Sequence, residues 1–70
     1  MFYKQHESTQ NAISKARKIL GLTQAELADE IAVTRQTIIA IEKGNYTPSV
    51  LLALKLAKSL NKSVEELFWL

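Results

Sequence analysis

The sequence predicts a small all-α domain of five helices, and three observations support this prediction. Apolar residues recur three and four positions apart along most of the chain after residue 8, which is the period of one helix face. A Ser or Thr stands before each such stretch, where its hydroxyl can accept hydrogen bonds from first-turn N–H groups. No alternating pattern typical of a strand accompanies them. We therefore divide the chain into an N-terminal arm, residues 1–8, and one helical domain, residues 9–70.

The composition fits one helical core without disulfides, because 47% of the 70 residues are hydrophobic and none is cysteine. The longest apolar run, Val50–Leu54, is too short to span a membrane. The first residues lack the apolar core of a signal peptide, so we expect a soluble, cytoplasmic protein. The net charge of +2 is only mildly basic, and nucleic-acid binding must be argued from the positions of the charges.

Residues 21–44 predict a helix, a tight turn and a second helix. Thr23 and Glu26 have the spacing of a capping box, and Thr34 can cap the second helix. Gly44 can adopt the left-handed conformation that ends it. The apolar stripes are Leu27, Ala28 and Ile31 in the first helix, and Ile38 and Ile41 in the second. Helices this short and closely joined must cross steeply, which is the geometry of a helix-turn-helix.

The segment LTQAELADEIAVTRQTIIAIEKGNYTPS resembles the phage-repressor-like (Cro/Xre-type) helix-turn-helix family, and the resemblance runs from about Asn11 to Phe68. The matching residues are Gln24, Ala28, Thr34–Thr37 and Ile41–Gly44. The resemblance implies a compact five-helix lambda-repressor-like DNA-binding domain with the helix-turn-helix at helices 2 and 3. One residue departs from the family pattern, since Ala32 stands in the turn where glycine is usual. A positive φ at this alanine would cost about 1 kcal/mol.

In a helix-turn-helix the second helix enters the major groove, and its first residues face the base edges. Arg35 can donate to both guanine O6 and N7, and Gln36 can pair with adenine. Thr37 can reach a phosphate or a base edge. Ile39 and Ala40 can read only thymine methyl groups or DNA shape. The alternative for Arg35 and Gln36 is an ordinary solvated helix face.

Five further residues are expected to contact the phosphate backbone, namely Gln24, Thr34, Lys43, Asn45 and Tyr46. Gln24 is placed to donate to a phosphate beside the first N–H groups of its helix. Alternatives stay open for three others. Thr34 acts as a cap, Asn45 can simply shape the turn, and Tyr46 can pack on the following helix.

Arg17 lies beside the apolar stripe of the first helix, and Glu42 directly follows Ile41. In the resembling family these two positions form a partly buried ion pair. A desolvated guanidinium is stable when a carboxylate fills its fork of donors. The alternative role for Arg17 is a phosphate contact.

The first, fourth and fifth helices complete the expected domain. We place their starts at a Ser8 or Thr9 cap, at a Thr47 cap followed by Pro48, and at a Ser63 cap. The expected inner faces are Ile13, Ala16 and Leu20, widened by Ala12 and Ile19, in the first helix and Val50, Ala53, Leu54, Ala57 and Leu60 in the fourth. Asn61 is expected to end the fourth helix in the left-handed conformation.

The arm contains two aromatic residues, Phe2 and Tyr3. Either they pack against the C-terminal residues 68–70, or they belong to a frayed end, because chain termini are commonly disordered.

The sequence favours neither an enzyme nor a metal site, and we expect no cofactor. The single histidine, His6, lies in the arm, and the seven carboxylates lack the spacing of metal ligands.

These observations indicate a small transcriptional regulator that binds double-stranded DNA, most simply a repressor. One recognition helix contacts few base pairs, so we expect a homodimer on a palindromic operator. The expected interface is an apolar surplus made of Leu51, Leu52, Trp69 and Leu70. Alternatively, the aromatic residues of the arm cover this surplus within one monomer.

A different class of function stays open beside this one. The apolar pair Ile39 and Ala40 and the C-terminal Trp69 and Leu70 would also suit a protein-interaction module. An antitoxin-like partner with secondary DNA binding is an example.

Overall fold

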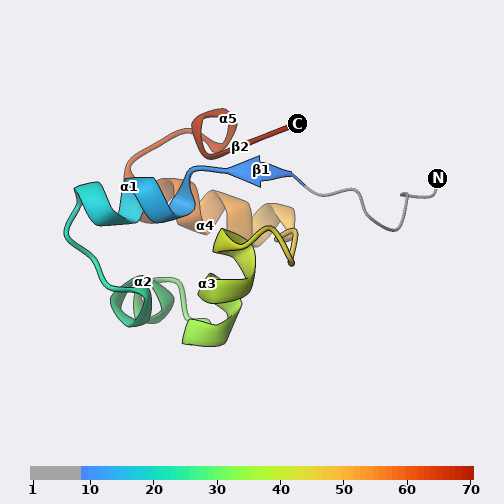
Figure 1. The fold of residues 1–70 in the computed structure, drawn as a ribbon. Helices are drawn as coiled ribbons and strands as arrows, with labels where there is room; N and C mark the ends of the chain where they lie inside the picture. Colours follow the sequence, from blue (N-terminus) through green and yellow to red (C-terminus); the bar gives the residue numbers. More distant parts are fainter. Residues whose placement is uncertain (1–8) are drawn as a thin grey trace.

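Five helices and one short pair of strands form the secondary structure of residues 9–70, the part of the chain that the computed structural model describes (Figure 1). In chain order the elements are β1 (Gln10–Asn11), α1 (Ile13–Ile19), α2 (Gln24–Glu30), α3 (Arg35–Glu42), α4 (Val50–Leu60), α5 (Val64–Leu67) and β2 (Phe68–Trp69). The predicted fold class is confirmed. The expectations for Phe2, Tyr3 and His6 lie outside the described residues.

A single core receives at least one fully buried side chain from every helix. The largest of these are Ile13, Leu27, Ile38, Ile41, Leu56, Leu60 and Leu67. Full burial of one Leu or Ile side chain contributes about 1.5–3 kcal/mol. A chain of this length buries only about 60% of the surface it exposes when unfolded. The core therefore has few residues to spare.

Side-chain caps fix the beginnings of four helices. The capping hydroxyls belong to Thr23, Thr34, Ser49 and Ser63, and each accepts from the backbone N–H three residues further on. Both predicted capping boxes are confirmed, with Glu26 and Glu66 reaching back to the cap residues. The hydrogen bonds from the Thr23 and Ser63 N–H groups lower the pKa of the Glu26 and Glu66 carboxyls.

The strand pair joins the two ends of the described chain and was absent from the sequence prediction. β1 and β2 are antiparallel, with Gln10 opposite Trp69. Beyond the strands, the Ala12 N–H donates to the Leu67 carbonyl oxygen at 2.9 Å. Each strand has only two residues, so neither carries the alternating pattern by which strands are recognised.

This pairing also corrects the predicted start of α1. The helix begins at Ile13 and does not follow a cap at Thr9, because the strand pair holds the backbone between them. Its buried residues are Ile13, Ala16 and Arg17. Ile19 and Leu20, expected on the inner face, are 71% and 49% exposed.

α4 differs from its prediction at its start and in its buried face. Ser49 caps it in place of Thr47, so Pro48 precedes the cap. The buried residues are Leu52, Ala53, Leu56 and Leu60. Val50 and Leu54, expected inside, are 77% and 55% exposed. Seven of the first eight residues of α4 are apolar, so their spacing alone does not select a face.

Three positive φ angles follow α2, α3 and α4, as predicted. They are 59° at Ala32, 77° at Gly44 and 55° at Asn61. Glycine adopts this conformation freely and asparagine tolerates it, whereas for other residues it costs roughly 1–2 kcal/mol. Ala32 is therefore a strained position. None of the described helices is long and apolar enough to cross a membrane.

We expect Ala32→Gly to raise the free energy of unfolding by about 0.5–1 kcal/mol, because relief of the left-handed strain exceeds the extra chain entropy of glycine. Urea titration followed by circular dichroism measures the change. Ala25→Gly on the exposed side of α2 is the matched control and should lower stability. Equal losses from both substitutions would contradict strain at Ala32.

Candidate nucleic-acid interface

α2 and α3 lie together at the end of the molecule opposite α5 and the strand pair (Figure 1). Their connection is tight, because the Val33 N–H donates to the Ala28 carbonyl oxygen at 3.0 Å. Ile38 and Ile41 anchor α3 in the core, with 0% and 1% exposure. The opposite side of α3 is thereby turned toward solvent.

The outer face of α3 contains the residues that the sequence assigned to base contact. Arg35 and Gln36 in the first turn are exposed, while Thr37, Ile39 and Ala40 are half-buried. Thr34 acts as the helix cap, and its hydroxyl oxygen lies 3.1 Å from that of Thr37. The polar atoms of this face are therefore concentrated at the beginning of the helix.

The residues assigned to phosphate contact flank this face at its two ends. Lys43, Asn45 and Tyr46 are exposed after α3. Gln24 is half-buried at the first position of α2, close enough to Arg35 for a hydrogen bond of 3.1 Å. The fold thus places one group of polar side chains at the beginning of α3 and a second group after its end.

A buried ion pair lies behind this surface. The Arg17 Nε donates to the Glu42 Oε2 at 2.7 Å, and the two side chains are 10% and 9% exposed. A second donor of Arg17, Nη1, binds the Leu22 carbonyl oxygen at 2.8 Å. The structure therefore contains the pair that the family resemblance implied. Its burial disfavours a phosphate contact by Arg17.

Hydrogen bonds continue from this ion pair to the surface. Gln24 Nε2 donates to Glu42 Oε1 at 3.0 Å, and Arg35 Nη2 donates to Gln24 Oε1 at 3.1 Å. Each buried side-chain nitrogen and oxygen in the described part of the chain has a partner. A polar network inside a small core is tolerable because it is satisfied in this way.

Asn11 is a functional position that sequence reasoning missed. Its Nδ2 donates to the Ile41 carbonyl oxygen at 2.9 Å, and its Oδ1 accepts from the Ile13 N–H at 3.1 Å. One side chain thus joins the start of α1 to the end of α3. An asparagine just before an apolar stripe is a capping signal, and this signal could have identified it.

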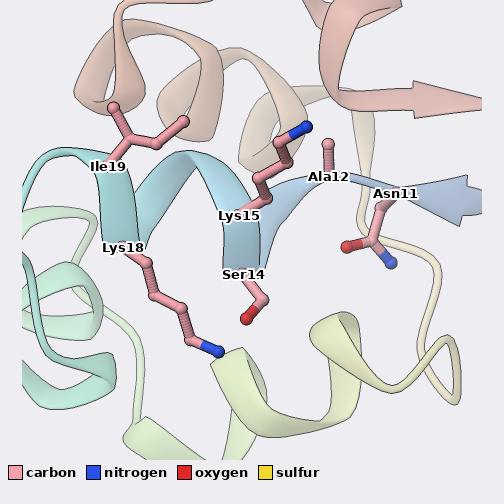
Figure 2. A pocket seen from close by; sticks show the side chains of 6 residues that line it. All are labelled: Asn11, Ala12, Ser14, Lys15, Lys18 and Ile19. Atoms are coloured by element: carbon pink, nitrogen blue, oxygen red, sulfur yellow. The ribbon is translucent and has the colours of Figure 1, made fainter.

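A shallow surface hollow of about 590 Å³ lies beside α1. Figure 2 shows that its side chains diverge, with Ser14 and Lys18 on one side and Lys15 and Ile19 on the other. The hollow therefore does not direct its polar groups at one point, as a small-molecule site would. Within residues 9–70, no three His, Cys, Asp or Glu side chains are placed to hold a metal ion.

Three of the four residues assigned to a dimer interface are exposed. Leu51, Trp69 and Leu70 are 65%, 44% and 98% exposed. Leu52 is only 9% exposed and belongs to the core, so its assignment to a free surface is wrong. The cause is the misjudged face of α4.

Residues 13–67 match the family model for the helix-turn-helix. The chain belongs to the Cro/C1-type helix-turn-helix family. Within it, this Cro/C1-type domain is 47% identical over 60 residues to the uncharacterized HTH-type transcriptional regulator YgzD of Bacillus subtilis, covering 86% of this chain and 91% of YgzD. It is 54% identical over 57 residues to an HTH-type transcriptional regulator of Methanothermobacter thermautotrophicus, covering 80% and 83% of the two chains.

Two solved structures are similar to this Cro/C1-type domain. The restriction-modification controller protein C.AhdI of Aeromonas hydrophila has a TM-score of 0.72 at 30% identity, over 77% of this chain and 82% of that one. The clp gene regulator ClgR of Corynebacterium glutamicum also has a TM-score of 0.72, at 28% identity, over 76% of this chain and 56% of ClgR.

We expect Glu42→Ala to destabilise this Cro/C1-type domain by about 3–5 kcal/mol, because it leaves the Arg17 guanidinium buried and unpaired. Urea titration measures the loss. The double variant Arg17→Met/Glu42→Leu removes both charges and should recover most of it. If the double variant were as unstable as Glu42→Ala, an unpaired charge would not be the cause.

Proposed function

We propose that this protein is a transcriptional regulator that binds double-stranded DNA sequence-specifically through the beginning of α3. The observation that carries the proposal is the exposed pair Arg35 and Gln36, in the first turn of a capped helix whose other side is anchored in the core. Membership of the family supports it, as do relatives named as transcriptional regulators. The protein would act in the cytoplasm and need no cofactor.

In this proposal Arg35 reads guanine through O6 and N7, and Gln36 reads adenine through N6 and N7. Thr37 reaches a base edge or a phosphate. Ile39 and Ala40 are apolar and half-buried, so they contribute contact with thymine methyl groups or sensitivity to groove shape. Sequence choice would therefore rest mainly on the first turn of α3.

Contacts to the phosphates would orient the domain on the duplex and supply affinity that depends on salt. The proposed contacts are Gln24, Thr34, Lys43, Asn45 and Tyr46. Lys43 provides the positive charge at the far end of α3. Gln24 has two amide hydrogens, of which one is engaged by Glu42, so the other can donate to a phosphate.

The proposed assembly is a homodimer on a palindromic operator. Exposed apolar side chains support it, because Leu51, Trp69 and Leu70 have no polar cover. A hollow of about 140 Å³, lined in part by Val50, Ala53 and Phe68, connects the beginning of α4 to β2 on the same surface. A dimer that covers a promoter would make the protein a repressor.

The second candidate is a protein-interaction module, such as an antitoxin-like partner whose DNA binding is secondary. Its support is the same apolar surface, because Val50 and Leu54 add 77% and 55% exposure to that of Leu51. A pull-down that recovers one stoichiometric protein would favour it. Loss of this capture on Leu51→Glu would place the partner on α4.

Selection from a random duplex pool at near-physiological salt should recover a palindrome with half-sites about 10 base pairs apart. Arg35→Ala should lose the preference at one base pair of each half-site, worth roughly 1–3 kcal/mol. Binding titrations on single-base operator variants measure this loss. Selection of no motif would contradict sequence-specific binding and favour the interaction module.

Leu51→Glu should weaken self-association, because it places a charge on the proposed apolar interface. Sedimentation equilibrium at tens of micromolar, with and without operator, measures the mass. Leu20→Glu on α1 changes another exposed leucine and is the matched control. A monomeric wild-type protein under both conditions would contradict the dimer.

A further inference from the structure

Gln24 lies between a buried carboxylate and the exposed guanidinium of Arg35. Its Nε2 donates to Glu42 Oε1 at 3.0 Å, while its Oε1 accepts from Arg35 Nη2 at 3.1 Å. Glu42 is itself held by Arg17 at 2.7 Å and is only half-buried at the outer end of the pair. The side chain of Gln24 therefore connects an ordered core group to a solvent-exposed one.

The orientation of the Gln24 amide follows from the chemistry of its partners. An ionised carboxylate only accepts hydrogen bonds, so the amide nitrogen must face Glu42. The amide oxygen then faces the opposite way, where Arg35 supplies a donor. A guanidinium only donates, so the reversed amide would lose both hydrogen bonds. The buried ion pair thus determines which end of Gln24 faces Arg35.

We propose that Gln24, oriented by Glu42, is a positioning residue for sequence choice, because it holds the Arg35 guanidinium in place for base contact. The inference rests on the proposed role of Arg35 in DNA reading. It assigns Gln24 a second task besides its expected phosphate contact. Holding Arg35 before binding reduces the side-chain freedom that is lost on the DNA.

The arrangement leaves Arg35 able to bind a base. A guanidinium has five N–H donors, and the hydrogen bond to Gln24 uses one of them. Two others remain for the paired contact with guanine O6 and N7. Arg35 can therefore contact DNA without leaving Gln24.

The first test uses the free protein and does not depend on DNA binding. In wild-type protein the Arg35 Nε–H should give an NMR order parameter well above that of a freely moving side chain. In Gln24→Met, which keeps the length of the side chain but removes the amide, the order parameter should fall toward values below about 0.6. Equal order parameters in the two proteins would overturn the positioning role.

The second test compares binding to the selected operator with binding to an operator changed at the base pair read by Arg35. Gln24→Met should reduce the wild-type preference between them by about threefold or more, out of the roughly tenfold or greater preference expected of one arginine contact. In an Arg35→Ala background the same substitution should not change the preference further. Thermal melts of each variant establish that it is folded.

Lys43→Met is the matched control, because it removes a proposed phosphate contact at the other end of α3. It should weaken binding to both operators by the same factor. If Gln24→Met also weakens both equally while Arg35→Ala changes the preference, the positioning role is wrong and the proposed function stands. If Arg35→Ala leaves the preference unchanged, base reading by Arg35 is wrong, and the positioning role that rests on it is wrong as well.

Discussion

The geometry of the two central helices depends on the buried Arg17–Glu42 ion pair. Arg17 belongs to α1, Glu42 ends α3, and the Leu22 carbonyl oxygen bound by Arg17 precedes α2. An unpaired guanidinium in the core would cost several kcal/mol, so these three segments must meet in one arrangement. Apolar residues of similar size could supply comparable stability. The distinctive contribution of the pair is therefore the position of α3 relative to α1.

The same interaction extends to the surface of the domain. Because the Glu42 carboxylate is fixed from one side by Arg17, its other oxygen is a fixed acceptor for Gln24. The first residues of α2 and α3 are thereby tied together at Gln24 and Arg35, outside the apolar core. Asn11 adds a second polar link between α1 and α3. Hydrogen bonds thus set a surface that apolar packing alone would leave less precisely defined.

Local chemistry made much of the fold predictable from sequence. The Thr23 and Ser63 capping boxes and the left-handed Ala32 depend on residues close in the chain. The strand pair was not predictable, because it joins distant two-residue segments through backbone atoms. The face of α4 was ambiguous because its first two turns are almost wholly apolar. At the candidate site, exposure of Arg35 followed from pattern, but its bond to Gln24 required three-dimensional structure.

The amount of sequence information that one α3 can read bears on the proposed assembly. Ile39 and Ala40 offer no hydrogen-bonding groups, which leaves Arg35 and Gln36 as the main readers. Two contacts of roughly 1–3 kcal/mol each give at most about 6 kcal/mol per domain. Specific binders exceed their own non-specific binding by about 4–10 kcal/mol, so a single domain reaches only the lower part of that range. Two copies joined through Leu51 and the C-terminal residues would double the discrimination, and this surface leaves Arg35 uncovered.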